Sequence, residues 1–188
     1  MRDSRTTKDL IDRTALELFA KKGVKETTIR DIAERAGIAE GTMYRHYAGK
    51  DELAWRLFET NYTALGGELA EVEGGKESCR EKIRAMIGYF CDAFSKDPER
   101  FVYLFFARHD HMLKLNPRQP NPYLVFRRVI RNAMNRGEIP KGDPDVAASM
   151  VMGVVLQVID SRLLSGRIKR SIASLADEIA EGCWKVVA

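Results

Sequence analysis

Apolar side chains recur every three or four positions along almost the whole chain, and no run alternates apolar and polar residues as a half-buried strand would. The rhythm begins with Ile11, Ala15, Leu18 and Phe19, and Gly23 follows where a glycine commonly closes a helix. The pattern predicts an all-α fold whose first helix ends near Gly23.

Two short helices are expected next. Thr28 and Asp31 have the spacing of an N-terminal capping box, apolar residues line one face of the segment that follows, and Gly37 ends it. A third short helix is expected over residues 40–47. Two short helices joined by a tight turn that begins with glycine are typical of a helix-turn-helix, whose second helix lies in the major groove of DNA.

The rest of the chain predicts longer helices separated by glycine and proline. Residues 49–52 open a fourth helix, which is expected to weaken at the glycine pair 66–67. Three more helices are expected after it, and the clearest loop covers residues 116–122. A long helix is expected over about residues 143–164, and a last one over residues 171–187.

Side-chain direction in the third helix separates anchoring positions from reading positions. Met43 and Tyr47 are four residues apart and are expected to pack inward, which turns Tyr44 outward. Gly41 lets the backbone approach the wall of the groove, and Lys50 at the next helix start suits a phosphate. The segment therefore predicts contacts with base edges and with the DNA backbone.

The same residues resemble one known family. The segments TIRDIAERAG (28–37), GTMYRHY (41–47) and KDEL (50–53) are similar in order, spacing and residue type to the TetR family of transcription regulators. The resemblance covers about residues 9–57, and beyond them only the number and lengths of the helices match. It implies an N-terminal three-helix helix-turn-helix domain followed by a helical ligand-binding and dimerisation domain, about nine helices in all.

The resemblance also implies domain boundaries and DNA contacts. The DNA-binding domain is expected at residues 1–50, and the ligand-binding and dimerisation domain at residues 51–188. Arg45 falls at a variable position of the recognition helix and is added to the positions that meet DNA in the family. The expected DNA-binding residues are Thr28, Arg30, Glu40, Gly41, Thr42, Tyr44, Arg45, His46 and Lys50.

Aromatic side chains at helical spacing in the second domain indicate either a pocket or an ordinary core. Members of the resembled family bind small molecules between these helices, so the resemblance implies a pocket for a small-molecule effector. His109 is the candidate polar group within it. The candidate ligand-binding residues are Trp55, Phe58, Tyr62, Met86, Phe90, Phe94, Phe105, His109, Tyr123 and Phe126.

The long helix near the C-terminus is apolar nearly all round and needs cover on two sides. A second subunit is expected on one side, with the last helix completing a four-helix interface as in the resembled family. The expected dimer-interface residues are Val151, Val155, Val158, Ile159, Ile172, Leu175, Ile179 and Trp184. A monomer with this helix fully internal is the alternative.

Composition and charge fit a cytoplasmic protein that approaches a polyanion. The formal net charge is +4, no secretory signal follows Met1, and the longest nearly apolar stretch, residues 150–159, is about half of a membrane span. The three cysteines are widely spaced, as expected for reduced core thiols. His109 and His111 are two residues apart and cannot converge on one ion from a helix, so we expect neither a metal site nor a cofactor.

These patterns and the resemblance together predict a homodimeric, sequence-specific DNA-binding transcription regulator. The resemblance implies a repressor that a small, largely apolar or aromatic ligand releases from a pseudo-palindromic operator in double-stranded DNA. A helical enzyme is one alternative, but no Ser-His-Asp order, paired catalytic carboxylates or phosphate-cradling glycine loop stands out in the sequence. A helix-turn-helix used only for protein contacts is the other. The sequence does not specify the effector, the operator or the regulated genes.

Overall fold

The computed structural model describes residues 4–106, 111–116, 118–163 and 165–188 of the chain. Within these ranges it contains nine α-helices, two short 3₁₀ helices and no strand, which confirms the all-α prediction.

The chain divides into two compact units, one of residues 1–62 and 97–117, the other of residues 63–96 and 118–188. The boundary between them falls inside one helix, α4 (Lys50–Gly74). This division by packing differs from the predicted division by function at residue 50, which stays a prediction.

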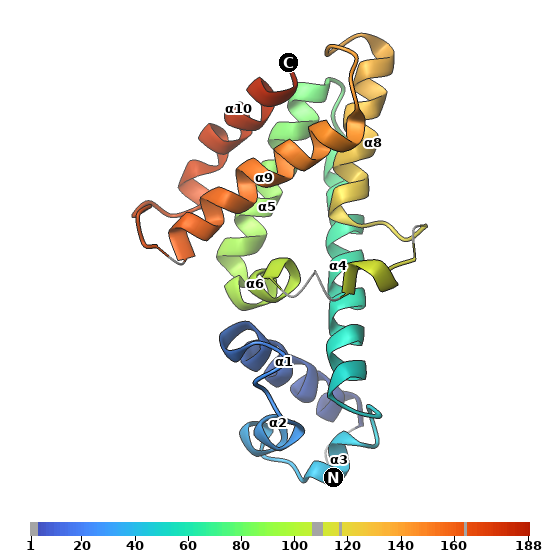
Figure 1. Ribbon diagram of the computed structural model, residues 1–188, viewed down its shortest axis with the longest axis vertical. Coiled ribbons are helices and arrows are strands. Elements are labelled where there is room, and N and C mark those ends of the chain that lie inside the picture. Colours follow the sequence, from blue (N-terminus) through green and yellow to red (C-terminus); the bar gives the residue numbers. More distant parts are fainter. Residues whose placement is uncertain (1–3, 107–110, 117, 164) are drawn as a thin grey trace. The chain divides into compact units, whose positions relative to one another are not determined.

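The first unit is built on α1, and its helices are α1 (Ser4–Lys22), α2 (Ile29–Ala36), α3 (Glu40–Met43), the first part of α4, α6 (Pro98–Phe106) and the 3₁₀ helix η1 (Met112–Lys114). Helix α1 packs against α2 and α6, and α2 packs against α3 (Figure 1). The ring of Phe19 stacks on that of Tyr103 with 5.7 Å between centroids. The Tyr103 hydroxyl donates a hydrogen bond of 2.5 Å to the carbonyl of Ala54, which fixes α6 to α4.

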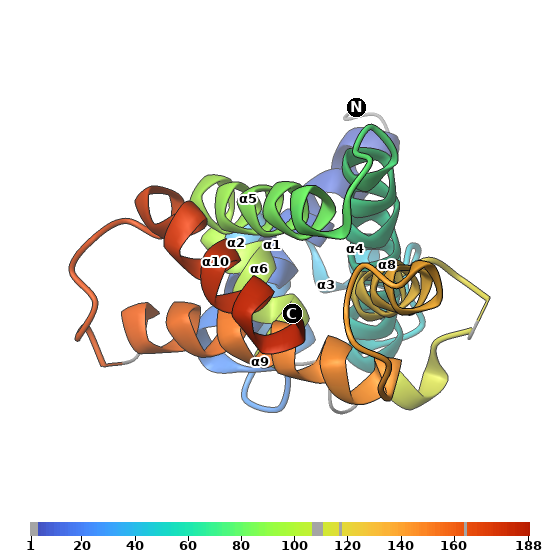
Figure 2. The same cartoon turned by 90° about the horizontal axis from the view of Figure 1, so that it is seen from above.

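The second unit consists of the rest of α4, α5 (Cys79–Lys96), α8 (Pro122–Arg136), α9 (Pro144–Leu163), the 3₁₀ helix η2 (Ala173–Leu175) and α10 (Ala176–Val187). Helix α10 lies along both α5 and α9, and α8 packs against the same two helices (Figures 1 and 2). The core of the second unit includes Ile83, Phe90, Phe126 and Val155, all fully buried.

The three cysteines lie in the core of the second unit with free thiols, as the sequence predicts. Burial raises the pKa of Cys79 and Cys91 to about 11 and that of Cys183 to about 12. Because the thiolate is the reactive form, these side chains behave as apolar core groups at neutral pH.

Three helix boundaries differ from the sequence-based expectation. The third helix ends at Met43 rather than Tyr47, because Arg45 and His46 form hydrogen bonds to carbonyls three residues back instead of four. Helix α4 continues through the glycine pair at 66–67 without a break. The last helix starts at Ala176, after the separate turn η2.

Gly66 has a packing role that explains the unbroken α4. A Cβ at this position would lie 2.5 Å from the backbone nitrogen of Asn121 and 2.7 Å from the carbonyl carbon of Pro120. The missing side chain therefore lets α4 approach the backbone at the start of α8. This packing stabilises the helix against the low helix propensity of glycine.

Helix α9 is apolar on more sides than its own unit covers. By length and composition it could cross a membrane, since an 18-residue stretch has a mean hydropathy of 1.5, and 28% of that stretch is buried. Its buried side chains, such as Val151 and Val155, pack in the unit that α8 and α10 share with it. Val146 and Met150 are each 49% exposed, so the residues that the structure describes leave one apolar face of α9 uncovered.

Candidate nucleic-acid interface

Helix α2 is fixed at both ends by local chemistry. The amide of Asp31 donates to Thr28 Oγ1 at 3.1 Å, and the amide of Thr28 donates to Asp31 Oδ2 at 2.9 Å, which completes the predicted capping box. The Thr28 amide lowers the pKa of the Asp31 carboxyl below 3.8, because it stabilises the charged form. Gly37 closes the helix in the left-handed region, with φ of 64°.

The recognition segment, residues 40–47, is held from the inside and open on the outside. Met43 and Tyr47 are buried, whereas Tyr44 between them is 57% exposed. These placements are as predicted, although only the first part of the segment is α-helical. An exposed phenol on a segment whose neighbours are anchored is suited to contact another molecule.

Tyr47 is the main anchor of the recognition segment. Its hydroxyl donates to Asp12 Oδ1 at 2.5 Å, and Lys8 pairs with the same carboxylate at 2.6 Å while lying over the Tyr47 ring. Burial, with the adjacent carboxylate, raises the pKa of Tyr47 to about 12, so the phenol stays protonated and donates at neutral pH. Sequence reasoning placed Tyr47 in the core but found neither partner on α1, because 35 residues separate Tyr47 from Asp12.

The nine predicted DNA-binding residues lie in one compact unit, at the N-cap and on the first turn of α2, on the recognition segment and at the start of α4, and none belongs to the core. Thr42, His46 and Lys50 are half-buried and the other six are exposed. Arg30 and Arg45 form no ion pair with any residue the structure describes, so their charges are available to phosphate. Lys50 donates instead to the carbonyl of Lys25 at 3.1 Å.

The predicted ligand-binding residues fall into two groups. Trp55, Phe58, Tyr62 and Phe105 belong to the first unit, where Phe58 stacks on Tyr62 at 5.0 Å and Tyr62 meets the edge of Phe105 at 6.1 Å. His109, the predicted polar group, lies outside the described residues. His111 instead joins this aromatic cluster, 5.2 Å from Phe58.

The other predicted ligand-binding residues belong to the second unit. Phe90 and Phe126 meet edge to face at 6.0 Å, with Met86 and Phe94 also buried. Tyr123 is tied to the start of α9, because its hydroxyl donates to Asp145 Oδ1 at 2.6 Å. The binding role of both groups stays a prediction.

The predicted dimer-interface residues are mostly covered by their own chain. Val158 and Trp184 are half-buried, and the other six are buried in the second unit: Val151, Val155, Ile159, Ile172, Leu175 and Ile179. Among the described residues of α9, the large apolar side chains that stay exposed are Val146, Met150 and Leu163. None of the three is among the predicted interface residues, because the periodicity of a helix that is apolar all round does not select one face.

The N-terminal part of the chain, which includes the recognition segment, matches a known family. Residues 11–57 match the sequence profile described as bacterial regulatory proteins, tetR family. The HTH-type transcriptional repressor KstR2 of Rhodococcus jostii is 32% identical over 79 residues, which are 42% of this chain and 38% of that protein. The chain thus matches less than half the length of this relative.

Two solved structures share the fold along most of the chain. The fatty acid degradation regulator FadR of Bacillus halodurans has a TM-score of 0.80 at 17% identity, with 93% of each chain covered. FadR of Bacillus subtilis, solved in complex with stearoyl-CoA, has a TM-score of 0.75 at 20% identity and covers 95% of this chain and 98% of its own. The helix-turn-helix, residues 11–57, thus belongs to the TetR family of transcriptional regulators, and the solved structures share the fold of the rest of the chain.

Proposed function

We propose that this protein is a transcription regulator that binds a specific site in double-stranded DNA through its recognition segment. One observation carries the proposal: Tyr44 is exposed between two buried anchors, with Arg45 beside it and unpaired among the described residues. Tyr44 is placed to contact base edges, and the cations Arg30 and Arg45 are placed to contact phosphates.

The proposed DNA-binding form is a homodimer. The uncovered apolar face of α9 at Val146 and Met150 supports a second copy as the missing cover, since burying apolar surface stabilises association. A two-fold dimer presents two recognition segments separated by about 34 to 36 Å or a multiple of that spacing. We therefore expect a pseudo-palindromic operator.

The proposed effector is a small, largely apolar ligand that releases the repressor from DNA. The aromatic and aliphatic interior of the second unit and the stearoyl-CoA bound to the Bacillus subtilis regulator make long-chain acyl thioesters the first compounds to test. Helix α4 contributes residues to both units, so we expect it to transmit the ligand's effect toward the recognition segment. The ligand weakens DNA binding only if it favours a conformer with wrongly spaced recognition segments.

Two variants test the DNA assignment through different signatures. Tyr44→Ala removes an exposed side chain, so we expect the fold to persist while specific binding weakens by about 1 to 3 kcal/mol and non-specific binding stays nearly unchanged. Lys50→Ala is expected to weaken binding to all duplexes alike and to lower the salt dependence.

Fluorescence anisotropy with a selected operator and a scrambled duplex, over a range of salt, measures both signatures. Lys76→Ala, which removes an exposed lysine in the second unit, is the control for loss of charge. Affinity of Tyr44→Ala for the operator equal to that of the wild type would refute the assignment.

A further inference from the structure

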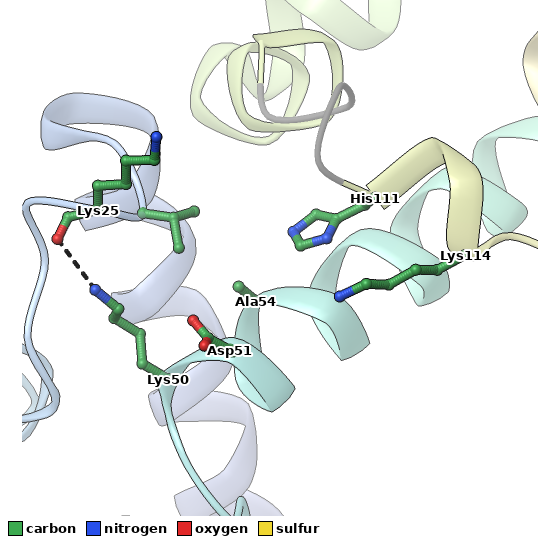
Figure 3. Close-up of a pocket in the computed structure, with 7 residues that line it drawn as sticks. Lys25, Lys50, Asp51, Ala54, His111 and Lys114 are labelled. Atoms are coloured by element: carbon green, nitrogen blue, oxygen red, sulfur yellow. Dashed lines mark hydrogen bonds between the residues drawn. The ribbon is translucent and has the colours of Figure 1, made fainter.

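A cavity of about 260 Å³ lies within the first unit, next to the aromatic cluster that His111 joins. It is lined by the α1–α2 loop, the start of α4, and His111 with η1 (Figure 3). Its lining residues are Val24, Lys25, Lys50, Asp51, Ala54, His111 and Lys114. A water molecule occupies about 30 Å³ in the liquid, so the cavity has room for a small molecule.

The lining of the cavity carries excess positive charge. Three lysines from three separate segments and one aspartate, Asp51, contribute to this lining. In Figure 3 the Lys25 ammonium points away from the other side chains, the Lys50 ammonium is directed at the Lys25 carbonyl, and the Lys114 side chain reaches toward Ala54. Lys114 forms no ion pair or hydrogen bond with any residue in the described part of the chain. An anion bound between these ammonium groups would reduce the electrostatic repulsion among them.

Two further features of the cavity favour an anion. His111 is 7% exposed, and its ring is packed 5.8 Å from Trp55 and 5.2 Å from Phe58, so its orientation is fixed. Figure 3 shows this ring directed into the space above Ala54. The cavity also contains the first two residues of the 25-residue helix α4, where the helix dipole and the free amides of the first turn attract negative charge.

We propose that this cavity binds a small phosphate-bearing anion. The Lys114 and Lys50 ammonium groups supply the charge, the first turn of α4 supplies amide donors, and the ring of His111 forms one wall. Lys114 is the discriminating residue, because it lies on η1 and is absent from the proposed DNA-binding set. Lys50 also belongs to the proposed DNA-binding set, so the test uses a free anion without DNA and a variant of Lys114.

Titration calorimetry of the full chain with inorganic pyrophosphate, at constant ionic strength and without DNA, tests the site. We expect saturable binding to the wild type. Lys114→Met is expected to weaken it about tenfold, the usual effect of losing one charged hydrogen-bond donor. Lys141→Met, which removes an exposed lysine in the second unit, is the matched control and is expected to leave binding unchanged. Since Lys114 is exposed, its substitution should not change the unliganded melting temperature.

Two results would overturn the proposal. The first is absence of saturable pyrophosphate binding, or equal weakening by Lys114→Met and Lys141→Met, which would indicate a general charge effect. The second is that Lys114→Met weakens non-specific duplex binding while pyrophosphate does not bind, because the cavity would then hold a phosphate of the DNA backbone instead of a free anion.

Discussion

Replacement of Gly66 by alanine tests the close packing of α4 on the start of α8. A Cβ at position 66 would meet backbone atoms of Pro120 and Asn121, at 2.7 Å from the carbonyl carbon and 2.5 Å from the nitrogen, respectively. Backbone atoms cannot rotate aside as a side chain can. The neighbouring Gly67 has nothing within 4 Å of the same position, so Gly67→Ala is a control one residue away on the same helix.

The two substitutions should change stability in opposite directions. Alanine is favoured over glycine inside a helix by about 0.5 to 1 kcal/mol, which is the stabilisation expected for Gly67→Ala. Gly66→Ala has the same gain, but overpacking costs about 1 to 3 kcal/mol or more. It also displaces Asn121, whose side chain caps α8 by accepting from the Leu124 amide at 3.0 Å, and loss of such a cap costs about 1 kcal/mol. We expect a net destabilisation of about 1 to 3 kcal/mol.

Urea unfolding followed by circular dichroism measures this difference, provided that the slope with denaturant is the same in all three proteins. The midpoint should rise for Gly67→Ala and fall for Gly66→Ala. If the Gly66→Ala protein is as stable as the wild type or more stable, α4 does not approach α8 as closely as described. Only the steric overlap from that close approach would outweigh the gain in helix propensity from alanine.

The remaining predictions concern the dimer face, acid stability and the thiols. Met150→Glu should convert the proposed dimer to a monomer in sedimentation while preserving helicity, because it places a charge on the uncovered face of α9. A dimer that persists would contradict the assignment of this face to the interface. The pKa of Asp31 is lowered in the folded protein, so its carboxylate stabilises the fold above the unfolded pKa and loses that contribution as the pH falls. The Asp31→Asn protein should therefore lose less stability than the wild type between about pH 5 and 3. Equal slopes of stability with pH in the two proteins would argue against the cap. Thiol-specific reagents at neutral pH should modify Cys79, Cys91 and Cys183 slowly in the folded protein and rapidly in denaturant; rapid modification of the folded protein would be inconsistent with their burial.

Features set by local backbone chemistry were predictable from the sequence. The capping pair Thr28 and Asp31 and the closing glycines Gly23 and Gly37 mark helix ends through contacts within a few residues, and the structure has them as expected, with φ of 83° and 64° at the glycines. The outward direction of Tyr44 was predictable for the same reason, because it follows from the spacing of its neighbours.

Features set by distant packing were not predictable. The pairing of Tyr47 with Asp12 joins residues 35 positions apart, and no local signal marks it. Helix α9 is apolar on all sides, so only its packing against α8 and α10 determines that Val155 is buried and Met150 is exposed. Likewise, the aromatic residues share a helical rhythm, but tertiary structure divides them between two units. From the sequence alone Gly66 is expected to weaken the helix, because its close contact with the backbone of Asn121 is visible only in the structure.

Selection of bound fragments from a random pool of duplex DNA by the purified full-length protein tests the central claim most directly. The exposed Tyr44 and the cations beside it predict enrichment of one pseudo-palindromic site, with half-sites about 34 to 36 Å apart or a multiple of that spacing. They also predict that the Tyr44→Ala protein enriches this site less. Recovery of unenriched DNA at moderate salt, with and without acyl thioesters, would contradict the claim that this segment reads DNA.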